Sequence, residues 1–332
     1  MRLKVIISSV VLFAVLLSCN REHVKFSQAR AGDFPALKVH VHRYGKTLFE
    51  LDTTQFAEGL KSIQNEYRFF LGDDFDNEQN VQQLLDYVSD TQLISLYHKT
   101  MAVYPDVHNL ENNLGKAFGR YHYFFPGQTL PGVFSYISDV YYESPVMKKD
   151  TVLVIALDDY LGGDFTLYRR LGIPQYRVRC MQKKSIAVDV MKALYYDELA
   201  PVYKPKTLLD RIIAGGKLLV YLDAVLPDVP DSVKMCYTAG QMTWAINNEK
   251  NTWAFMVENN LLYSTDYQVI TKLIQDGPFT EGFGKASPSR LGIFTGWQIV
   301  TQYMVNNPDV TLKEMINTTD AQTILEKSHY KP

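Results

Sequence analysis

The sequence predicts an α+β fold in which helices dominate. Apolar residues recur at helical spacing over most of the chain, as at Phe56 and Leu60, while runs typical of strands occupy only a few short segments. No repeat of fixed period is present, which argues against solenoids and propellers. We therefore expect one globular body over residues 36–332, with a mainly helical first half (36–130) and a sheet packed against helices in the second half (131–332).

The predicted strands lie in two regions of the chain. Residues 36–52 alternate apolar and polar side chains around Gly45, which predicts a first strand or a hairpin. Residues 133–143 and 151–157 predict two further strands, joined by a connection near Pro145. The segment 151–157 is a continuous apolar run, so we expect it inside the sheet rather than at an exposed edge.

Helices are predicted for the remaining periodic segments, and Thr53 or Thr54 is the expected cap of the first. The expected helices cover residues 53–67, 80–86, 91–103, 108–125, 186–199, 206–226, 232–247, 249–262, 266–275, 292–306, 311–315 and 320–328. Within the segment 292–306, Gly296 lies in mid-helix, where glycine costs ~1 kcal/mol relative to alanine. We therefore expect Gly296 to allow close approach of another backbone.

The N-terminus has the features of a bacterial lipoprotein signal. A basic start and an apolar run over residues 5–17 precede the letters LLSC, which end at Cys19. The run is shorter than the ~20 residues of a membrane-spanning helix and matches the apolar region of a signal peptide. We expect cleavage to remove residues 1–18, a diacylglycerol to modify Cys19, and residues 19–35 to form a lipidated tether. The acyl chains would then hold the body at a membrane.

Charge and sorting features indicate where the body resides. Asn20 follows Cys19 at the position where an inner-membrane retention signal usually has Asp, which favours the outer membrane, with the body facing the periplasm. The formal net charge of −2 gives no positive footprint for nucleic acid, which we exclude as a partner.

Two further cysteines, Cys180 and Cys236, have two explanations. An exported compartment permits a disulfide between them, and two separate buried cysteines acting as small hydrophobic residues are the alternative. Neither belongs to a CxxC or another zinc-ligand spacing.

Common catalytic motifs are missing from the chain. It has no H-E-x-x-H, GxSxG, SxxK or Walker sequence. Asp158 and Asp159 could form a catalytic carboxylate pair, but adjacent strand residues point to opposite faces, which favours a turn role instead. His40 and His42 could ligate a metal from one strand face, but a surface strand more often explains such a pair. The 22 tyrosines and three tryptophans could line a sugar-binding surface, but at helical spacing aromatic residues are more often core.

Several phrases of the second half resemble the gliding-motility lipoprotein GldB family. They are LDDYLGGDFTLYRRLGIPQY (157–176), GGKLLVYLDAVLPD (215–228), QMTWAINNEKNTWAFMVENNLLYSTD (241–266), GPFT (277–280), SPSRLGIFTGWQIVTQYM (287–304) and SHYKP (328–332). Together with LLSC they cover the start of the chain and most of residues 150–332. The resemblance implies a lipoprotein needed for surface gliding in bacteria that use the type nine secretion machinery, with no established enzymatic activity.

The family's second half is in turn similar to predicted zinc proteases of the zincin type. In those proteins a helix carries H-E-x-x-H, and a later E-G segment supplies another metal ligand. Here the helix at 187–198 has no histidine, and Ala214, Gly215 and Gly216 stand where the E-G pair is expected. The resemblance therefore implies a zincin-like fold, with a small sheet, that has lost its metal site and binds no cofactor.

Two classes of function follow. The first is a non-enzymatic envelope lipoprotein that docks a protein or peptide partner of the gliding and secretion machinery, in the old cleft or on the helical first half. The alternative is an envelope hydrolase of peptide or glycan that uses carboxylates such as Asp158, Asp159 or Glu249, or else a carbohydrate-binding lipoprotein. We expect residues 287–298 to form one wall of the cleft. The candidate partner-binding residues are Asp158, Asp159, Thr280, Arg290, Trp297 and Gln298.

Overall fold

The computed structural model describes residues 34–74 and 77–332. The predicted signal peptide, the lipidation site Cys19 and nearly all of the tether lie outside the described residues. Within the described part, helices dominate and surround one small sheet, as predicted. No helix in this part combines the length and the apolar character needed to span a bilayer.

The sheet contains β1 (Val41–His42), β2 (Gly132–Tyr136), β3 (Val146–Lys149) and β4 (Val152–Ala156) in the order β1-β2-β4-β3. β1, β2 and β4 run parallel, and β3 pairs antiparallel with β4 at one edge. β4 is the predicted apolar run, and its place between β2 and β3 buries Leu153 and Ile155 completely. Its prediction as an inner strand is confirmed.

The predicted N-terminal hairpin is wrong. Only two residues form β1, and the chain continues directly into helix α1, in which Tyr44 and Leu48 share one buried face. Gly45 lets this helix rest on the sheet, because a Cβ atom there would lie only 3.0 Å from the backbone of Tyr136. The predicted connection near Pro145 also contains an additional edge strand, β3, with two lysines that suit an edge.

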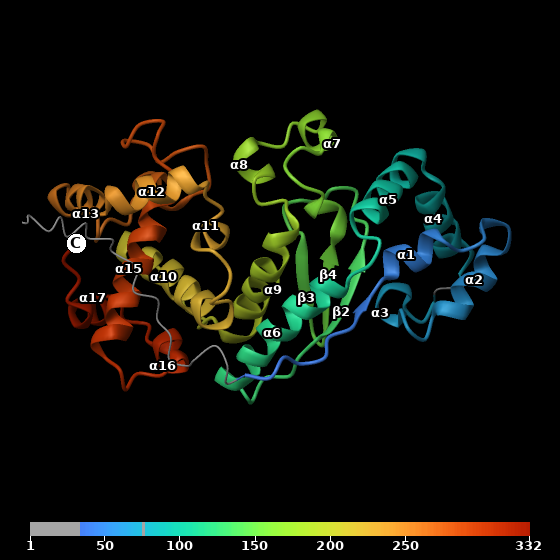
Figure 1. Ribbon diagram of the computed structural model, residues 1–332, viewed down its shortest axis with the longest axis horizontal. Helices are drawn as coiled ribbons and strands as arrows, with labels where there is room; N and C mark the ends of the chain where they lie inside the picture. Colours follow the sequence, from blue (N-terminus) through green and yellow to red (C-terminus); the bar gives the residue numbers. More distant parts are fainter. Residues whose placement is uncertain (1–33, 75–76) are drawn as a thin grey trace, which may run out of the picture.

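The helices of the first half are α1 (Tyr44–Phe49), α2 (Phe56–Ile63), α3 (Arg68–Leu71), α4 (Glu78–Ser89), α5 (Thr91–Val103) and α6 (His108–Phe124). Helices α2, α4, α5 and α6 lie in predicted helical segments, whereas α1 and α3 were not predicted as helices. Figure 1 shows most of these helices gathered at one end of the molecule. The predicted cap at Thr53 or Thr54 is wrong. Asp52 caps this segment instead, since its carboxylate accepts from the Thr54 backbone N–H at 2.8 Å.

The second half forms the other end of the molecule and the helices beside the sheet (Figure 1). Its helices are α7 (Thr166–Arg170), α8 (Gln175–Val178), α9 (Ile186–Leu194), α10 (Leu208–Val225), α11 (Asp231–Lys234), α12 (Ala239–Asn247), α13 (Glu249–Glu258), α14 (Tyr267–Ile274), α15 (Leu291–Asn306), α16 (Leu312–Asn317) and α17 (Ala321–Ser328). The predicted helix 232–247 is split because Cys236 has φ 55° and Thr238 starts a new helix with a capping box. Helix α9 packs against β3, β4 and α6.

Two glycines bring α10 and α15 into backbone contact. A Cβ atom on Gly296 would lie 1.7 Å from the carbonyl oxygen of Ile212, and one on Gly216 would lie 2.2 Å from the carbonyl oxygen of Gly296. Neither site can therefore hold a side chain without separating the helices. The predicted packing role of Gly296 is confirmed, and Gly216 shares it.

Candidate functional site

Two cavities lie beside helix α9. The first, which we call the α9 cleft, has a volume of about 300 Å³ and is lined by α9, the turn after β4, the loop 142–146 and residues near α8, α11 and α15. The second, which we call the α6 groove, has a volume of about 690 Å³ and lies between α6, the start of α9 and residues 226–230. The two cavities share no lining residue.

One wall of the α9 cleft is the face of α9 that carries Val188, Asp189 and Lys192. Asp189 and Lys192 form an ion pair at 3.1 Å, since residues three apart on a helix are neighbours. The hydroxyl of Tyr160 donates to the other Asp189 oxygen at 2.9 Å. The most prominent charges on this helix face therefore neutralise each other.

The opposite wall is held by long-range pairs. The Asp276 carboxylate forms ion pairs with Arg177 at 3.0 Å and with Arg290 at 2.8 Å, so it links the two guanidinium groups. Cys180 and Cys236 also line the cleft and are joined by a disulfide with a Cα–Cα distance of 5.5 Å. The alternative explanation, two separate buried cysteines, is therefore wrong.

Asp159 lines the cleft and Asp158 precedes it in the chain, and both are completely buried. The hydroxyl of Ser138 lies 3.0 Å from Asp158 Oδ2 and 3.3 Å from Asp159 Oδ2, so it links the two carboxyl groups. The prediction that they point to opposite faces is wrong, because β4 ends at Ala156 and a 3-10 turn follows. Asp158 has a turn role, but at another turn than the predicted one at residues 161–163, since its carboxylate accepts the backbone N–H groups of Ser138 and Val140.

Burial decides the protonation of this pair. It raises the pKa of Asp158, and together with the charge of Asp158 it raises the pKa of Asp159 to about 8. Asp159 Oδ1 has no hydrogen-bond partner in the part of the chain that the structure describes. At neutral pH Asp159 is therefore mainly a neutral carboxylic acid at the edge of the cleft.

Strained backbone gathers around the same cleft. Asp139 and Val140, beside the Asp158 contact, both have φ 60°, and Cys236 and Arg290 on the cleft have φ 55° and 59°. A non-glycine residue in this region costs free energy and persists only where its surroundings hold it. Such clustering favours a functional site at the α9 cleft.

The structure divides the predicted cleft residues. Asp159 and Arg290 line the α9 cleft, while Asp158 does not line it and is linked to Asp159 through Ser138. Thr280 is buried and donates to the Pro288 carbonyl at 2.8 Å. Gln298 is half-buried and lines neither cavity.

Trp297 is likewise a core residue. It is 3% exposed, and its indole nitrogen donates to Asp223 Oδ2 at 2.7 Å, beside the buried Lys234. The predicted cleft wall over residues 287–298 is therefore wrong except at Arg290. The segment continues into helix α15, and most of its residues there are buried in the core.

Sequence reasoning missed several cleft residues, namely Tyr160, Arg177, Asp189, Lys192 and Asp276. The signal available was the pair of charges in the otherwise apolar helix α9.

The other chemical candidates lie elsewhere. Glu249 accepts from Tyr330, while His42 contacts Glu66 and His40 contacts Glu111. Across residues 34–74 and 77–332, no group of three or more His, Cys, Asp or Glu side chains is arranged to hold a metal ion.

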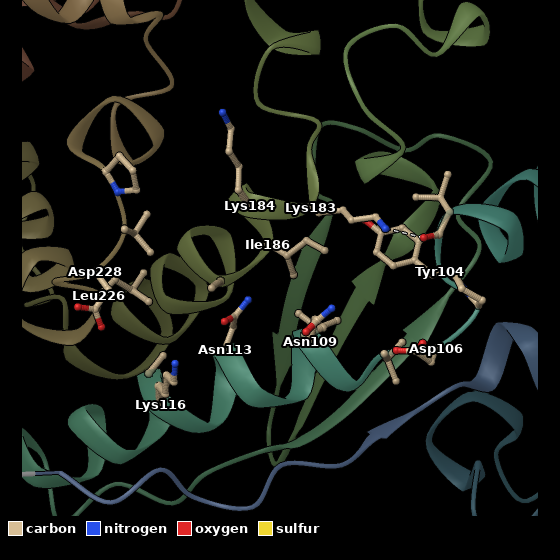
Figure 2. Close-up of a pocket in the computed structure, with 18 of the residues that line it drawn as sticks. Tyr104, Asp106, Asn109, Asn113, Lys116, Lys183, Lys184, Ile186, Leu226 and Asp228 are labelled. Atoms are coloured by element: carbon tan, nitrogen blue, oxygen red, sulfur yellow. Dashed lines mark hydrogen bonds between the residues drawn. The ribbon is translucent and has the colours of Figure 1, made fainter. Parts of the chain in front are cut away.

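The α6 groove has a different lining, and Figure 2 shows its side chains. Asn109 and Asn113 extend from α6 into the cavity, Lys116 lines it further along the same helix, and Lys183 and Lys184 lie above them on the facing wall. The Lys183 ammonium donates to the Val103 carbonyl at 2.5 Å. This groove can therefore offer amide and cationic groups to a ligand.

Comparison with known proteins gives one result. Residues 27–332 match the family model described as gliding motility protein GldB. No curated protein and no solved structure gives a significant match.

Proposed function

Since the chain belongs to the gliding motility protein GldB family, we propose that it supports gliding by docking a protein or peptide partner in the α9 cleft without cutting it. The family indicates a gliding-motility protein and a lipoprotein. The finer parts belong to this proposal: a lipid on Cys19, an outer-membrane position facing the periplasm, and a partner from the gliding and type nine secretion machinery.

The observation that carries the proposal is the face that α9 presents to the cleft. Val188, Asp189 and Lys192 line the cleft with the i, i+1 and i+4 spacing that the three named residues of an H-E-x-x-H helix have. Zinc binding and water activation at those positions need two imidazoles and a free carboxylate. Here the carboxylate is paired with the lysine and with Tyr160. We interpret the fold as a zincin-like scaffold in which an ion pair has replaced the metal site.

A steric block of the cleft tests the docking function. Ala193 lines the cleft, and Ala193→Phe would fill part of its volume of about 300 Å³. We expect cells that depend on this chain to lose colony spreading, with protein level and melting temperature unchanged. Ala57→Phe, at an exposed position of α2, is the matched control and should spread normally. Normal spreading of Ala193→Phe cells would contradict the proposal.

A hydrolase is the second candidate, and the linked pair Asp158 and Asp159 favours it. Two carboxyl groups that share a hydroxyl neighbour, one of them protonated near neutral pH, resemble a general acid beside a base. The isosteric change Asp159→Asn removes the acid and keeps the volume. Docking predicts normal spreading for this variant, because an amide matches the shape and the lack of charge of the protonated Asp159 that a partner would meet, whereas hydrolysis predicts its loss. A crosslinker placed at exposed Tyr196 on the cleft then identifies the partner, and capture of glycans alone would favour a carbohydrate-binding role.

A further inference from the structure

Arg120, at one end of the α6 groove, has unused donors in a buried place. Its side chain is 8% exposed, and its Nε has no hydrogen-bond partner in the described part of the chain. Its ion pair with Asp228 spans 3.4 Å, longer than the usual ~2.7–3.2 Å, and the Asp228 side chain is 70% exposed. A guanidinium has five N–H donors and pairs best with a planar carboxylate through two of them. Arg120 therefore retains the capacity to bind an anion.

The face of α6 that leads to Arg120 is polar. Asn109, Asn113, Lys116 and Arg120 are spaced i, i+4, i+7 and i+11, which places them along one side of the helix. Figure 2 shows both asparagines directed into the cavity. Neither asparagine side chain bonds another group in the described residues. Each amide has a donor and an acceptor, as a peptide unit does.

The spacing of the two asparagines fits an extended peptide. Four residues of α-helix rise ~6 Å, and two residues of an extended chain advance ~6.6 Å. The eleven residues from Asn109 to Arg120 span ~16 Å, the length of about five extended residues. Both asparagines can therefore pair with alternate peptide units of one strand while its end reaches Arg120.

The remaining lining suits a peptide better than a glycan. Buried apolar residues form the floor, namely Leu110, Ala117, Ile186, Ala187 and Leu226. Tyr104 is the one aromatic lining residue among those described, and it is 4% exposed with the Lys183 ammonium 4.7 Å from its ring centroid. Its ring is therefore not open for sugar stacking.

We propose that the α6 groove binds an extended peptide of about five residues, with its C-terminal carboxylate on Arg120 and its backbone paired with Asn109 and Asn113. Asp228 acts as an internal substitute for that carboxylate, which the ligand displaces. Because this site shares no lining residue with the α9 cleft, its failure would leave the docking function proposed for the cleft untouched.

The test uses the full-length chain in detergent micelles and a library of labelled, N-acetylated pentapeptides. Each peptide is made with a free C-terminal carboxylate and as the C-terminal amide, and binding is measured by fluorescence polarisation. We expect a subset of the free acids to bind and amidation to weaken their binding at least tenfold. Equal binding of acids and amides would overturn the proposal. Complete competition by millimolar inorganic phosphate, with no preference among peptides, would overturn it too.

Variants at exposed positions keep the test independent of folding. Asp228→Asn removes the internal competitor, so we expect several-fold tighter binding. The double variant Asn109→Ala/Asn113→Ala should bind at least tenfold more weakly, while Asn112→Ala on another face of α6 should bind as the parent does. If no free-acid peptide binds either the parent or Asp228→Asn, the proposal is wrong.

Discussion

The crossing of α10 with α15 and the α9 cleft are built from opposite kinds of residue. At the crossing, Gly216 and Gly296 leave out side chains so that two backbones touch. In the cleft, charged groups from distant segments hold one another, as Asp276 holds Arg177 and Arg290. The segment 287–298 contributes to both, since Arg290 lies on the cleft and the rest turns into the core. The unusual segment 287–298 was thus mainly a sign of helix packing, whereas charged residues without a recognisable motif form the cavity.

This difference predicts that substitutions at the crossing lower the stability of the fold, whereas a substitution of Asp159 in the cleft changes how that stability depends on pH. The largest expected effect is that of Gly296→Leu. Overpacking usually costs ~1–3 kcal/mol, and here two backbones rather than flexible side chains would have to separate, so we expect no cooperative thermal unfolding transition. Circular dichroism melting checks this. Gly127→Leu is the control, because a Cβ there meets nothing within 4 Å. An unchanged melting temperature for Gly296→Leu would refute the packing role.

A second, smaller effect concerns the pH dependence of stability. An unfolded aspartate loses its proton near pH ~4. Asp159 in the folded chain does so near its pKa of about 8, so folding takes up a proton between these values. The free energy of unfolding should therefore fall as pH rises through this range, by several kcal/mol at ~1.4 kcal/mol per unit of pKa shift.

Urea denaturation of the parent and Asp159→Asn at pH 4.5, 6.5 and 8.5 measures this contribution. Asparagine does not titrate, so the variant should gain stability relative to the parent as pH rises. Carboxylates away from this pair are common to both proteins and cancel, so the difference reports Asp159 together with its coupling to Asp158. A difference that stays constant over the three pH values would show that Asp159 titrates normally.

The smallest of these effects is expected for Trp297→Phe. The change keeps most of the apolar ring but removes the N–H that bonds Asp223, a carboxylate that is 5% exposed. Leaving a buried acceptor without this donor costs ~1–3 kcal/mol. Chemical denaturation should show this loss, whereas Trp244→Phe, whose indole N–H bonds no group in the described residues, should change stability less. Equal losses would assign the effect to ring volume alone.

Much of the fold could be predicted from local patterns. Residues 91–103 form α5 with the predicted bounds, and the apolar run at 151–157 contains the inner strand β4, because periodicity records which face of an element is buried. The hairpin at Gly45 failed because Tyr44 and Leu48 stand four residues apart, which is the spacing of one helix face, and both are buried in α1. Of the candidate cleft residues, only Asp159 and Arg290 line the cavity.

Local composition and spacing were enough to establish the helical class, most helix positions and the close packing required at Gly296. These depend on side chains a few residues apart, which the order of the chain fixes directly. The meeting of Arg177 with Asp276, the Cys180–Cys236 bond and the position of Asp158 beside Ser138 depend on segments far apart in the chain. Only tertiary packing brings such groups within 3 to 6 Å of each other, and it also sets the burial that raises the pKa of Asp159.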